Sequence, residues 1–586
     1  MIYVSSHNII SSLGFTSYEN LKNIRNRISG IKLSEDTELS PEAVFISLVS
    51  YDEIEKKFSE ISKKREKYTK YEKLLILSVS DAIKGSKIDI KKDDTVFIVS
   101  TTKGNINLLE KSKKDIFPVD RLKLWKSSEI AADFFGKKDN VLTISNACIS
   151  GSLAVIVAQR LINSGRYKNA VVVGADILSE FTLSGFLAFK AVSEGVCKPF
   201  DRNRTGMTPG EGAATIILTS EKSLSDNSGI VISGGSTSND ANHISGPSRT
   251  GKELAIAVKN ALKESNLKPD EIEFISGHGT ATPYNDETES LALELAGLQN
   301  APLTGIKGYI GHTFGAAGIA ETVIACEALK NNEIYGTAGF EKTGVSGKIN
   351  IQKEYKRTKL KTALKTASGF GGCNAVLISE KEKKIIKTAE ESETNLVIIR
   401  KTVISDNKIT VNNKEVYVYS ENEKDFSGFA KSVYKHYKIK YPKFYKADNL
   451  SKLGFLAAEI LLKDTSVLLN YKSEDIAVIL SNESSSLDTD FKYQKTIDDR
   501  ENYFPSPSVF VYTLANIVIG EICIRHKIKG ENTVFISEKF DKSFIFDYVK
   551  TLFATGKAKA CIVGRLNYGF PDGNYYAELY LTENKI

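Results

Sequence analysis

The feature that most constrains the fold of this chain is an alternation of short β-branched runs with helical segments. Residues 95–99 and 170–174 are two such runs, and residues 154–163 between them have a helical pattern that ends at Gly165. A second series begins at residues 230–232 and continues with a helix over 253–265 and a strand over 273–276. Strands separated by helices predict βαβ units and a buried mixed sheet.

Cys148 stands where one predicted strand ends and the next predicted helix begins. An apolar run leads to it, and an amphipathic segment over residues 153–162 follows. A thiol at the N-terminus of a helix feels the positive end of the macrodipole, which favours the thiolate. A lone cysteine is more often only a small buried side chain, so neighbouring motifs must decide between the two interpretations.

Two of the six histidines stand in glycine-rich turns downstream of Cys148. His278 lies in Gly-His-Gly-Thr-Ala-Thr-Pro, and His312 lies in Lys-Gly-Tyr-Ile-Gly-His-Thr-Phe-Gly-Ala-Ala-Gly. Residues 368–375 follow as Ser-Gly-Phe-Gly-Gly-Cys-Asn-Ala. This ordered set favours a nucleophilic role for Cys148, because nucleophiles of this kind work with neighbouring histidines.

In this order the motifs resemble those of the β-ketoacyl-(acyl carrier protein) synthases, most closely the elongating Cys-His-His type. Residues 198–204 and 210–214 match a further block of that family, and residues 3–14 resemble its first strand and turn. The resemblance covers about residues 1–382. It implies an α/β thiolase fold of two pseudo-symmetric αβαβα halves, residues 1–228 with the nucleophile and residues 229–382 with both histidines.

The resemblance implies an acyltransferase that forms carbon–carbon bonds. An acyl group moves from a carrier thioester to Cys148, a malonyl thioester then loses CO2, and the carbanion attacks the acyl group, which gives a β-ketoacyl chain two carbons longer. His278 and His312 are the implied hydrogen-bond donors to the enolate oxygen. No metal or cofactor is implied, because the substrates are carried on the phosphopantetheine of an acyl carrier protein.

Other catalytic and supporting residues are also implied by the resemblance. The backbone N–H groups of Cys148 and Phe370 are the implied oxyanion hole, and Phe370 is also the implied gate beside the thiol. Lys307 and Glu321 match a buried pair that orders the site, which is tolerated only when it is well hydrogen-bonded. We expect glycines on both sides of Phe370 to let this loop move.

Further residues match the family pattern less completely. Thr280 and Thr282 are the implied contacts to the pantetheine arm. Ala281 replaces a common glycine, which we expect to be a small change, and Cys373 replaces a common threonine and is not an expected catalytic residue. Ile149 replaces a smaller residue after the nucleophile, so the chain-length preference stays open.

The C-terminal part begins after a charged stretch, residues 383–395, that we interpret as a linker. Beyond it the chain repeats its own beginning. On this alignment Phe540 takes the position of Cys148. We therefore interpret residues 396–586 as a degenerate, non-catalytic copy of the first half, that is, an extra, partial thiolase-like α/β domain. The matching blocks are residues 73–83 with 452–462, 94–100 with 475–481, 161–165 with 552–556, and 172–174 with 562–564.

Half a thiolase fold exposes a large face that must be covered by the catalytic domain, a twin subunit or a separate protein. Inactive synthase-like partners in related systems shape the acyl pocket, so pocket shaping or partner docking is one expected role. A remnant kept only for stability is the alternative.

The bulk composition predicts a soluble, cytoplasmic protein. With 586 residues, 41% apolar and 26% charged, the chain should form more than one globular domain. No apolar run is long enough to span a membrane, and the start of the chain lacks the features of a signal peptide. Six cysteines without paired spacing favour a reducing compartment and argue against a metal site.

A basic segment is the candidate docking site for the acyl carrier protein. Lys63, Lys64, Arg65 and Lys67 precede an amphipathic stretch in a chain of net charge +7. On its own such a segment is typically a solvated helix face. The resemblance favours carrier docking, because acyl carrier proteins are acidic and attraction of this kind raises the encounter rate. Nucleic acid is a poorer partner, because no recognisable module with interleaved aromatic residues accompanies these charges.

Two other functions remain as alternatives. The first is a non-catalytic, chain-length-factor type of partner subunit, in which the nucleophile is normally lost. The second is a degradative thiolase, which is disfavoured because it needs a second catalytic cysteine and Cys373 stands in the wrong context. The pathway is either fatty acid synthesis or a specialised polyene or polyketide route, including the aryl-polyene type. The family dimerises, so we expect a homodimer or a heterodimer with a ketosynthase-like subunit.

Overall fold

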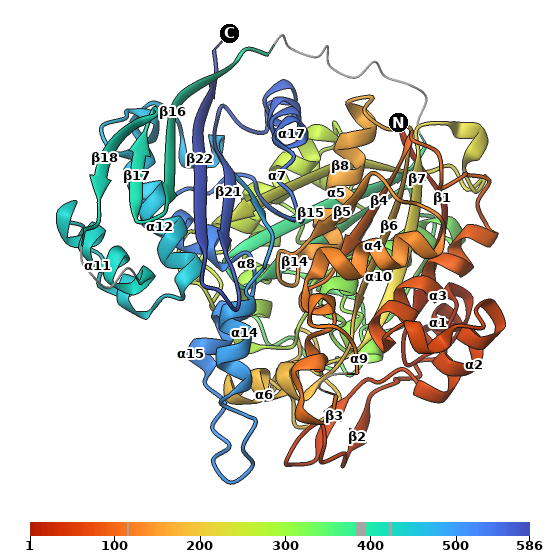
Figure 1. Ribbon diagram of the computed structural model, residues 1–586. Helices are drawn as coiled ribbons and strands as arrows, with labels where there is room; N and C mark the ends of the chain where they lie inside the picture. Colours follow the sequence, from red (N-terminus) through yellow and green to blue (C-terminus); the bar gives the residue numbers. More distant parts are fainter. Residues whose placement is uncertain (114–115, 383–393, 421–424, 586) are drawn as a thin grey trace. The chain divides into compact units, whose positions relative to one another are not determined.

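The computed structural model describes residues 1–113, 116–382, 394–420 and 425–585. Contacts divide the chain into two compact units (Figure 1). The first unit contains residues 1–237, 246–369 and 374–386, and the second contains residues 238–245, 370–373 and 387–586. The second unit therefore includes two short segments from the region that carries the motifs.

The first half of the first unit is built on a sheet with the strand order β5-β4-β6-β7-β1. The parallel strands β4, β5 and β6 are followed by two antiparallel ones. β4, β6 and β7 are buried along their whole length, which explains why the predicted strands are continuous apolar runs. The bounds are β1 (Ile2–Ile10), β4 (Thr95–Ser100), β5 (Val141–Ile144), β6 (Asn169–Asp176) and β7 (Gly212–Thr219).

The second half repeats this arrangement with the strand order β10-β9-β14-β15-β8. When the strands of each half are counted along the chain, both sheets read third, second, fourth, fifth, first. The two sheets join where β1 and β8 pair antiparallel. The expected pseudo-symmetry is therefore present in the strand order. The bounds are β8 (Ile230–Asn239), β9 (Phe274–Ser276), β10 (Pro302–Thr304), β14 (Thr362–Gly369) and β15 (Cys373–Lys381).

Two equivalent helices lie between these sheets and bring the motifs together. α5 (Ser150–Asn163) contacts β4 and β6, α10 (Ala317–Asn331) contacts β9 and β14, and the two helices contact each other. Their close approach requires glycine, because a Cβ atom at Gly151 would lie 2.8 Å from the Gly315 carbonyl oxygen. The expectation that residues 153–162 are amphipathic is wrong, since this central helix is buried on every side from Ser150 to Ile162.

Outer helices cover the other faces of the two sheets. α3 (Lys70–Lys84) packs on β1, β6 and β7. α7 (Lys252–Glu264) and α8 (Pro283–Leu295) pack with the second sheet around the apolar side chains of Leu254, Leu293 and Leu364. The first unit thus has the layers of an αβαβα sandwich.

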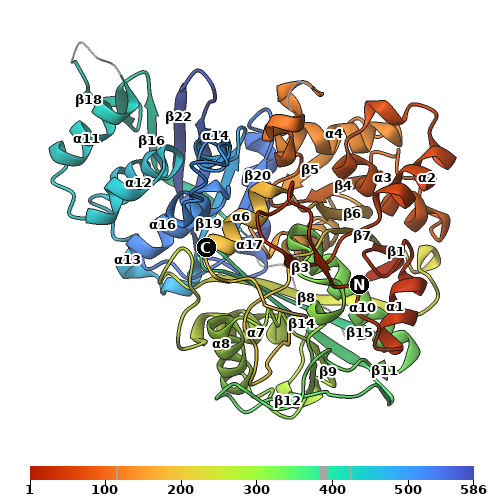
Figure 2. The same cartoon turned by 90° about the horizontal axis from the view of Figure 1, so that it is seen from below.

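The second unit contains a third sheet of the same order, β20-β19-β21-β22-β16. Its strand directions also match those of the first sheet, with three parallel strands followed by two antiparallel ones. Helices α12 (Asn449–Leu462) and α16 (Ile517–His526) pack side by side in this unit (Figure 2). The bounds are β16 (Leu396–Ser405), β19 (Ile476–Asn482), β20 (Asn532–Ile536), β21 (Ala560–Tyr568), β22 (Tyr575–Asn584) and, between β20 and β21, α17 (Lys542–Ala554).

The position of Phe540 in this third sheet matches the position of Cys148 in the first. Phe540 lies in the turn between β20 and α17, four residues after Ile536, as Cys148 lies four residues after Ile144 between β5 and α5. Most of the predicted linker falls outside the described residues. In the part of the chain that the structure describes, no single helix is long and apolar enough to cross a bilayer; Pro507–Thr513 and Ile517–His526, bent by 100°, meet the length and composition criteria only as a pair.

Candidate active site

The turn that carries Cys148 is held in a strained conformation. Ala147 has a φ of 48°, in the left-handed region that is costly for a residue with a Cβ atom. The Ser150 hydroxyl fixes this turn, because it accepts a hydrogen bond from the Asn146 N–H (2.8 Å) and donates one to the Ala147 carbonyl (2.6 Å). Cys148 is partly exposed, whereas the other five cysteines are buried and free. Cys148 is therefore the one cysteine among the described residues whose side chain a substrate can reach.

The protonation state of Cys148 differs from the expectation. Although Cys148 is partly exposed, the groups packed around its thiol exclude water, and this desolvation raises the pKa of the thiol to about 12. The positive charge of Lys307 offsets only part of the rise. The expected thiolate is therefore wrong for the resting protein, because desolvation outweighs the helix macrodipole. Cys148 rests as a thiol and must lose its proton as it reacts.

The two motif histidines lie together in the first unit. His278 follows β9, and His312 lies between α9 (Lys307–Ile310) and α10. Their ring centroids are 5.4 Å apart with the rings nearly perpendicular, and His312 stacks on Phe314. Both side chains are buried. The family resemblance implied this pairing, although the two histidines are more than thirty residues apart in the chain.

Hydrogen bonds determine which ring nitrogen carries the proton. The Phe314 N–H donates to His312 Nδ1 (3.2 Å), so this nitrogen is an acceptor. The Lys307 ammonium, which can only donate, lies 3.3 Å from His278 Nδ1. Burial and the charges of the nearby lysines lower the pKa of both imidazoles well below 6.5, so both are neutral. Each ring therefore carries its proton on Nε2, and His312 Nε2 has no hydrogen-bond partner among the described residues.

Lys307 and Glu321 form the predicted buried pair, but a second lysine shares the carboxylate. Lys307 Nζ lies 2.6 Å from Glu321 Oε1 and donates to the His278 carbonyl at 2.5 Å. Lys365 Nζ lies 2.8 Å from Glu321 Oε2, and its side chain is only 2% exposed. Sequence reasoning missed Lys365, because β14 (Thr-Ala-Leu-Lys-Thr-Ala-Ser-Gly) is not an apolar run and gave no sign that its lysine is buried.

The acidic residues of the first histidine motif hold its loop in place. Glu289 accepts hydrogen bonds from the N–H groups of His278 (2.7 Å) and Gly279 (2.8 Å). Asp286 accepts one from the Ala281 N–H (3.1 Å). Ala281 has a φ of 63°, so the replacement of glycine at this position is not a small change, because it strains the backbone by about 1 kcal/mol.

The two predicted pantetheine contacts lie at the end of this loop. The Oγ1 atoms of Thr280 and Thr282 are 2.9 Å apart, and Thr280 is nearly buried while Thr282 is partly exposed. Thr282 precedes α8 without capping it through its side chain. Both hydroxyls lie on the same loop as His278, and their role toward the pantetheine arm stays a prediction.

Asp176 is a further residue that sequence reasoning missed. This buried carboxylate accepts hydrogen bonds from the Thr101 hydroxyl (2.7 Å), the Thr102 N–H (2.9 Å) and the Gly315 N–H (2.7 Å). It thus ties the end of β4 in the first half to the His312 loop in the second. In the sequence, the only indication that Asp176 has a special role is its position as an acidic residue at the end of a buried strand.

The Phe370 loop belongs to the second compact unit, so its assignment to the oxyanion hole beside Cys148 stays a prediction. Within that unit the loop is tightly held: Asn516 Nδ2 donates to the Phe370 carbonyl (2.7 Å), and Asn239 Nδ2 donates to the Gly371 carbonyl (2.9 Å). Asn516 comes from the C-terminal region, 146 residues away in the chain. Gly371 and Gly372 have positive φ values, which explains the glycines at these two positions.

The predicted docking residues lie around a short 3-10 helix, Arg65–Lys67, just before α3. Lys63, Lys64, Arg65 and Lys67 are all exposed. None of the ion pairs found among the described residues involves any of these four side chains. The segment is therefore an uncompensated positive surface.

Comparison with known proteins agrees with this geometry. Residues 15–223 match the family model of the beta-ketoacyl synthase N-terminal domain, and residues 229–341 match that of the C-terminal domain. Together the matches span more than half of the chain. This chain belongs to the β-ketoacyl synthase family. Neither match extends to residues 342–586.

Two curated relatives show how far the likeness extends. A putative polyketide beta-ketoacyl synthase 1 of Streptomyces halstedii is 31% identical over 269 residues, which are 43% of this chain and 64% of that relative. The 3-oxoacyl-[acyl-carrier-protein] synthase 2 of Staphylococcus aureus (strain COL) is 24% identical over 357 residues, 56% of this chain and 84% of the relative. The chain thus spans slightly less than two thirds of the length of the Streptomyces relative.

Two solved structures share the fold. The structure titled PfaC keto synthase-chain length factor has a TM-score of 0.78 at 14% identity, covering 100% of this chain and 78% of the other. The ketosynthase ApeO in complex with its chain length factor ApeC, from Xenorhabdus doucetiae, has a TM-score of 0.56 at 24% identity, with coverage of 65% and 98%. At these identities the likeness concerns the fold alone.

Proposed function

We propose that this protein is an elongating β-ketoacyl-acyl carrier protein synthase that condenses malonyl-carrier with an acyl group held on Cys148. The observation that carries the proposal is the pair of neutral imidazoles, each with its proton on Nε2, in the same unit as a strained cysteine elbow. When a malonyl thioester loses CO2, its carbonyl oxygen becomes a negatively charged enolate oxygen. Two adjacent N–H donors can stabilise this oxygen.

In the first step Cys148 Sγ attacks the carbonyl carbon of the acyl thioester. A new carbon–sulfur bond forms, and the bond to the carrier sulfur breaks. The Cys148 proton leaves with the carrier thiol, so the raised pKa of Cys148 does not leave a charge behind. An N–H donor near the thiol must hold the tetrahedral oxyanion, and the Cys148 and Phe370 backbone groups are the proposed donors.

In the second step the malonyl group loses CO2. The electron pair of the broken carbon–carbon bond becomes an enolate, whose oxygen accepts hydrogen bonds from Nε2 of His278 and His312. The enolate carbon then attacks the acyl carbonyl on Cys148, and the bond from this carbonyl carbon to Cys148 Sγ breaks. The released thiolate takes a proton from water, and the hydroxide left behind combines with CO2 as bicarbonate. The positive charges of Lys307 and Lys365 favour each anionic state while they keep both imidazoles neutral.

We further propose that the second unit acts as a built-in partner of the chain-length-factor type, derived from a copy of the first half. Its sheet has the same order and directions as the first sheet, and Phe540 stands at the nucleophile position. Its Asn516 holds the carbonyl of the proposed gate, Phe370. A wholly non-catalytic subunit is the alternative function, and the intact Cys148 and histidine pair argue against it.

The experiment that tests the proposal is intact-mass measurement of the purified protein with acyl- and malonyl-carrier. The wild type should gain the mass of the acyl group and release a product two carbons longer, and Cys148→Ala should do neither. A wild type that neither acylates nor condenses with any acyl carrier tested would contradict the proposal and favour the non-catalytic partner.

A further inference from the structure

The second unit carries a basic surface that the proposed condensation does not use. Residues 431–446 contain six lysines and no acidic residue. All six lysine side chains are exposed, and none takes part in an ion pair within the described ranges of the chain. Lys431 and Lys435 stand one turn apart on α11 (Phe426–His436), where like charges repel. We call residues 431–446 the C-terminal basic segment.

The aromatic residues of the C-terminal basic segment hold it against the rest of the unit. Tyr434 stacks on Phe444 with centroids 4.7 Å apart, and Tyr441 stacks on Phe455 of α12 at 5.1 Å. Tyr441 also donates to Glu521 Oε2 (3.1 Å). Because these rings are engaged, they do not form a free platform for nucleotide bases, although tyrosines and lysines alternate in the sequence.

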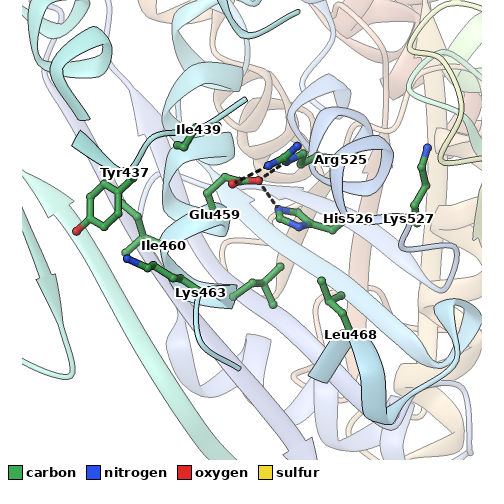
Figure 3. A pocket seen from close by; sticks show the side chains of 10 residues that line it. Tyr437, Ile439, Glu459, Ile460, Lys463, Leu468, Arg525, His526 and Lys527 are labelled. Carbon is green, nitrogen blue, oxygen red and sulfur yellow. Dashed lines mark hydrogen bonds and ion pairs between the residues drawn. The ribbon is translucent and has the colours of Figure 1, made fainter. Parts of the chain in front are cut away.

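A pocket of about 460 Å³ opens beside the C-terminal basic segment (Figure 3). Its volume is in the range of small-molecule sites. Figure 3 shows side chains from four places converging on it: the C-terminal basic segment, α12, the following short helix and the C-terminal end of α16. Aliphatic side chains form part of the wall, namely those of Ile439, Ile460, Leu462 and Leu468.

The polar side of this pocket is positive. Arg525 is paired with both carboxylate oxygens of Glu459, so these two charges cancel. Lys463 Nζ lies over the Tyr437 ring, 5.1 Å from its centroid, and Lys527 Nζ donates to the Ala241 carbonyl at 3.3 Å. Neither lysine has a carboxylate partner in the part of the chain that the structure describes. Burial lowers the pKa of His526 to about 4, so its ring is neutral. Its Nε2 lies 3.4 Å from Glu459 Oε1 and, with 10% of the side chain exposed, makes no hydrogen bond.

We propose that this surface is a second docking site for the acyl carrier protein: the acidic carrier binds the C-terminal basic segment, and its phosphopantetheine arm enters the pocket. A pocket with positive groups and aliphatic walls suits an arm that joins a phosphate to an apolar acyl chain. The row of exposed lysines extends beyond the pocket and therefore fits a macromolecular anion. This inference rests on the proposed function, which makes the carrier a partner of the chain.

The repeated topology favours a carrier protein over a lipid surface. The predicted docking segment of the first half, around Arg65–Lys67, lies just before α3, the first long helix before strand β4. The C-terminal basic segment lies just before α12, the corresponding helix before β19. The first half of the first unit and the second unit thus carry exposed lysines just before the equivalent helix of the same topology. A flat bilayer would also leave the pocket unfilled, whereas a flexible arm fills it.

The binding test uses full-length protein in which Cys148→Ala prevents acyl transfer and charge reversal at Lys63, Lys64, Arg65 and Lys67 removes the first predicted docking site. The probe is a fluorescently labelled holo-acyl carrier protein of bacterial fatty acid synthesis. Triple charge reversal at Lys435, Lys438 and Lys443 should weaken binding at least tenfold at low salt, because it removes a long attractive surface. The matched control reverses Lys414, Lys472 and Lys539, which are exposed in the same unit, and should change binding less than twofold. Equal effects of the two triple variants would overturn the proposal.

The pocket is tested separately with Leu468→Trp. Leu468 is 37% exposed, so the larger side chain should fill the pocket without preventing folding. It should weaken binding of the holo-carrier about tenfold and leave the apo-carrier, which lacks the arm, unchanged. An equal effect on both forms, or on neither, would contradict insertion of the arm.

Two further outcomes separate this inference from its competitors. Sedimentation with vesicles containing 30% phosphatidylserine, abolished by the Lys435, Lys438 and Lys443 reversal while carrier binding stays intact, would show a membrane surface and overturn the proposal. Acylation of wild-type Cys148 by a small acyl thioester that needs no carrier reports on the proposed function by itself. A failure of the proposed function is thus distinguishable from a failure of the docking proposal.

Discussion

Adding a single methyl group at Gly520 tests whether the C-terminal region holds the Phe370 loop. Gly520 lies inside α16, where replacement of glycine by alanine ordinarily stabilises a helix by about 1 kcal/mol. A Cβ atom here would lie 2.9 Å from both the Cα and the carbonyl oxygen of Gly371. These are backbone atoms that cannot rotate away, so the loop must move, and overpacking of this kind costs about 1–3 kcal/mol.

The two contributions have opposite signs, so the direction of the change identifies the dominant one. With the contact present, Gly520→Ala should lower stability by about 1 kcal/mol, which for a unit of this size is a drop of about 2–4 °C in the melting temperature of the second unit. Without the contact, the same substitution should raise the melting temperature by a similar amount. Scanning calorimetry measures both.

The condensation rate of the Gly520→Ala protein shows whether movement of the Phe370 loop affects function. A shift of Gly371 carries Phe370 with it, and small misplacements in an active site are costly, so we expect the rate to fall about tenfold. Asn516→Ala removes the hydrogen bond to the Phe370 carbonyl without adding volume and should also slow condensation. Gly195→Ala is the control, because its Cβ atom would have no heavy atom within 4 Å. A Gly520→Ala protein that melts higher and condenses normally would refute the reasoning.

Three more predictions concern the first unit. Alkylation of Cys148 by iodoacetamide, followed by mass spectrometry, should quicken about tenfold per pH unit from pH 7 to 10 without a plateau, because the pKa of the thiol is raised to about 12; a plateau near pH 7 would contradict this. His278→Gln and His312→Gln should each leave acylation of Cys148 intact and slow malonyl decarboxylation by about 10²–10³-fold, measured as CO2 release; equal loss of both steps would instead indicate misfolding. Lys365→Met should raise the pKa of both histidines, since the charge of Lys365 lowers it, and so shift the acidic limb of the pH–rate profile to higher pH; an unshifted limb would count against that role.

The sequence predicted those parts of the fold that depend on local pattern. The strands over 95–99 and 170–174 lie within β4 and β6, because buried parallel strands are continuous apolar runs. The helix over 253–265 coincides with α7 to within one residue at each end, since its apolar residues recur at helical spacing and face one core. The two histidines could be paired because each glycine-rich turn matches a motif of the family that the sequence resembles.

Properties that arise from tertiary packing could not be predicted. The pKa of Cys148 depends on how far surrounding groups exclude water, which outweighs the local effect of the helix. Lys365 contacts Glu321 only because β14 and α10 pack together. The two residues are more than forty positions apart in the chain, so no local pattern predicts their ion pair. The strain at Ala281 depends on a backbone angle that composition does not reveal.

The charge distribution of the second unit argues against a remnant kept only for stability. A sheet of the same order, with Phe540 in place of the nucleophile, would be sufficient for a purely structural role. Six exposed lysines in sixteen residues add repulsion to such a role and contribute no ion pair among the described residues. Lysines that lower the stability of the unit through mutual repulsion are better explained by a role in binding. The charge of the second unit therefore supports the proposal that this unit binds an acidic partner, which a remnant kept only for stability would not need to do.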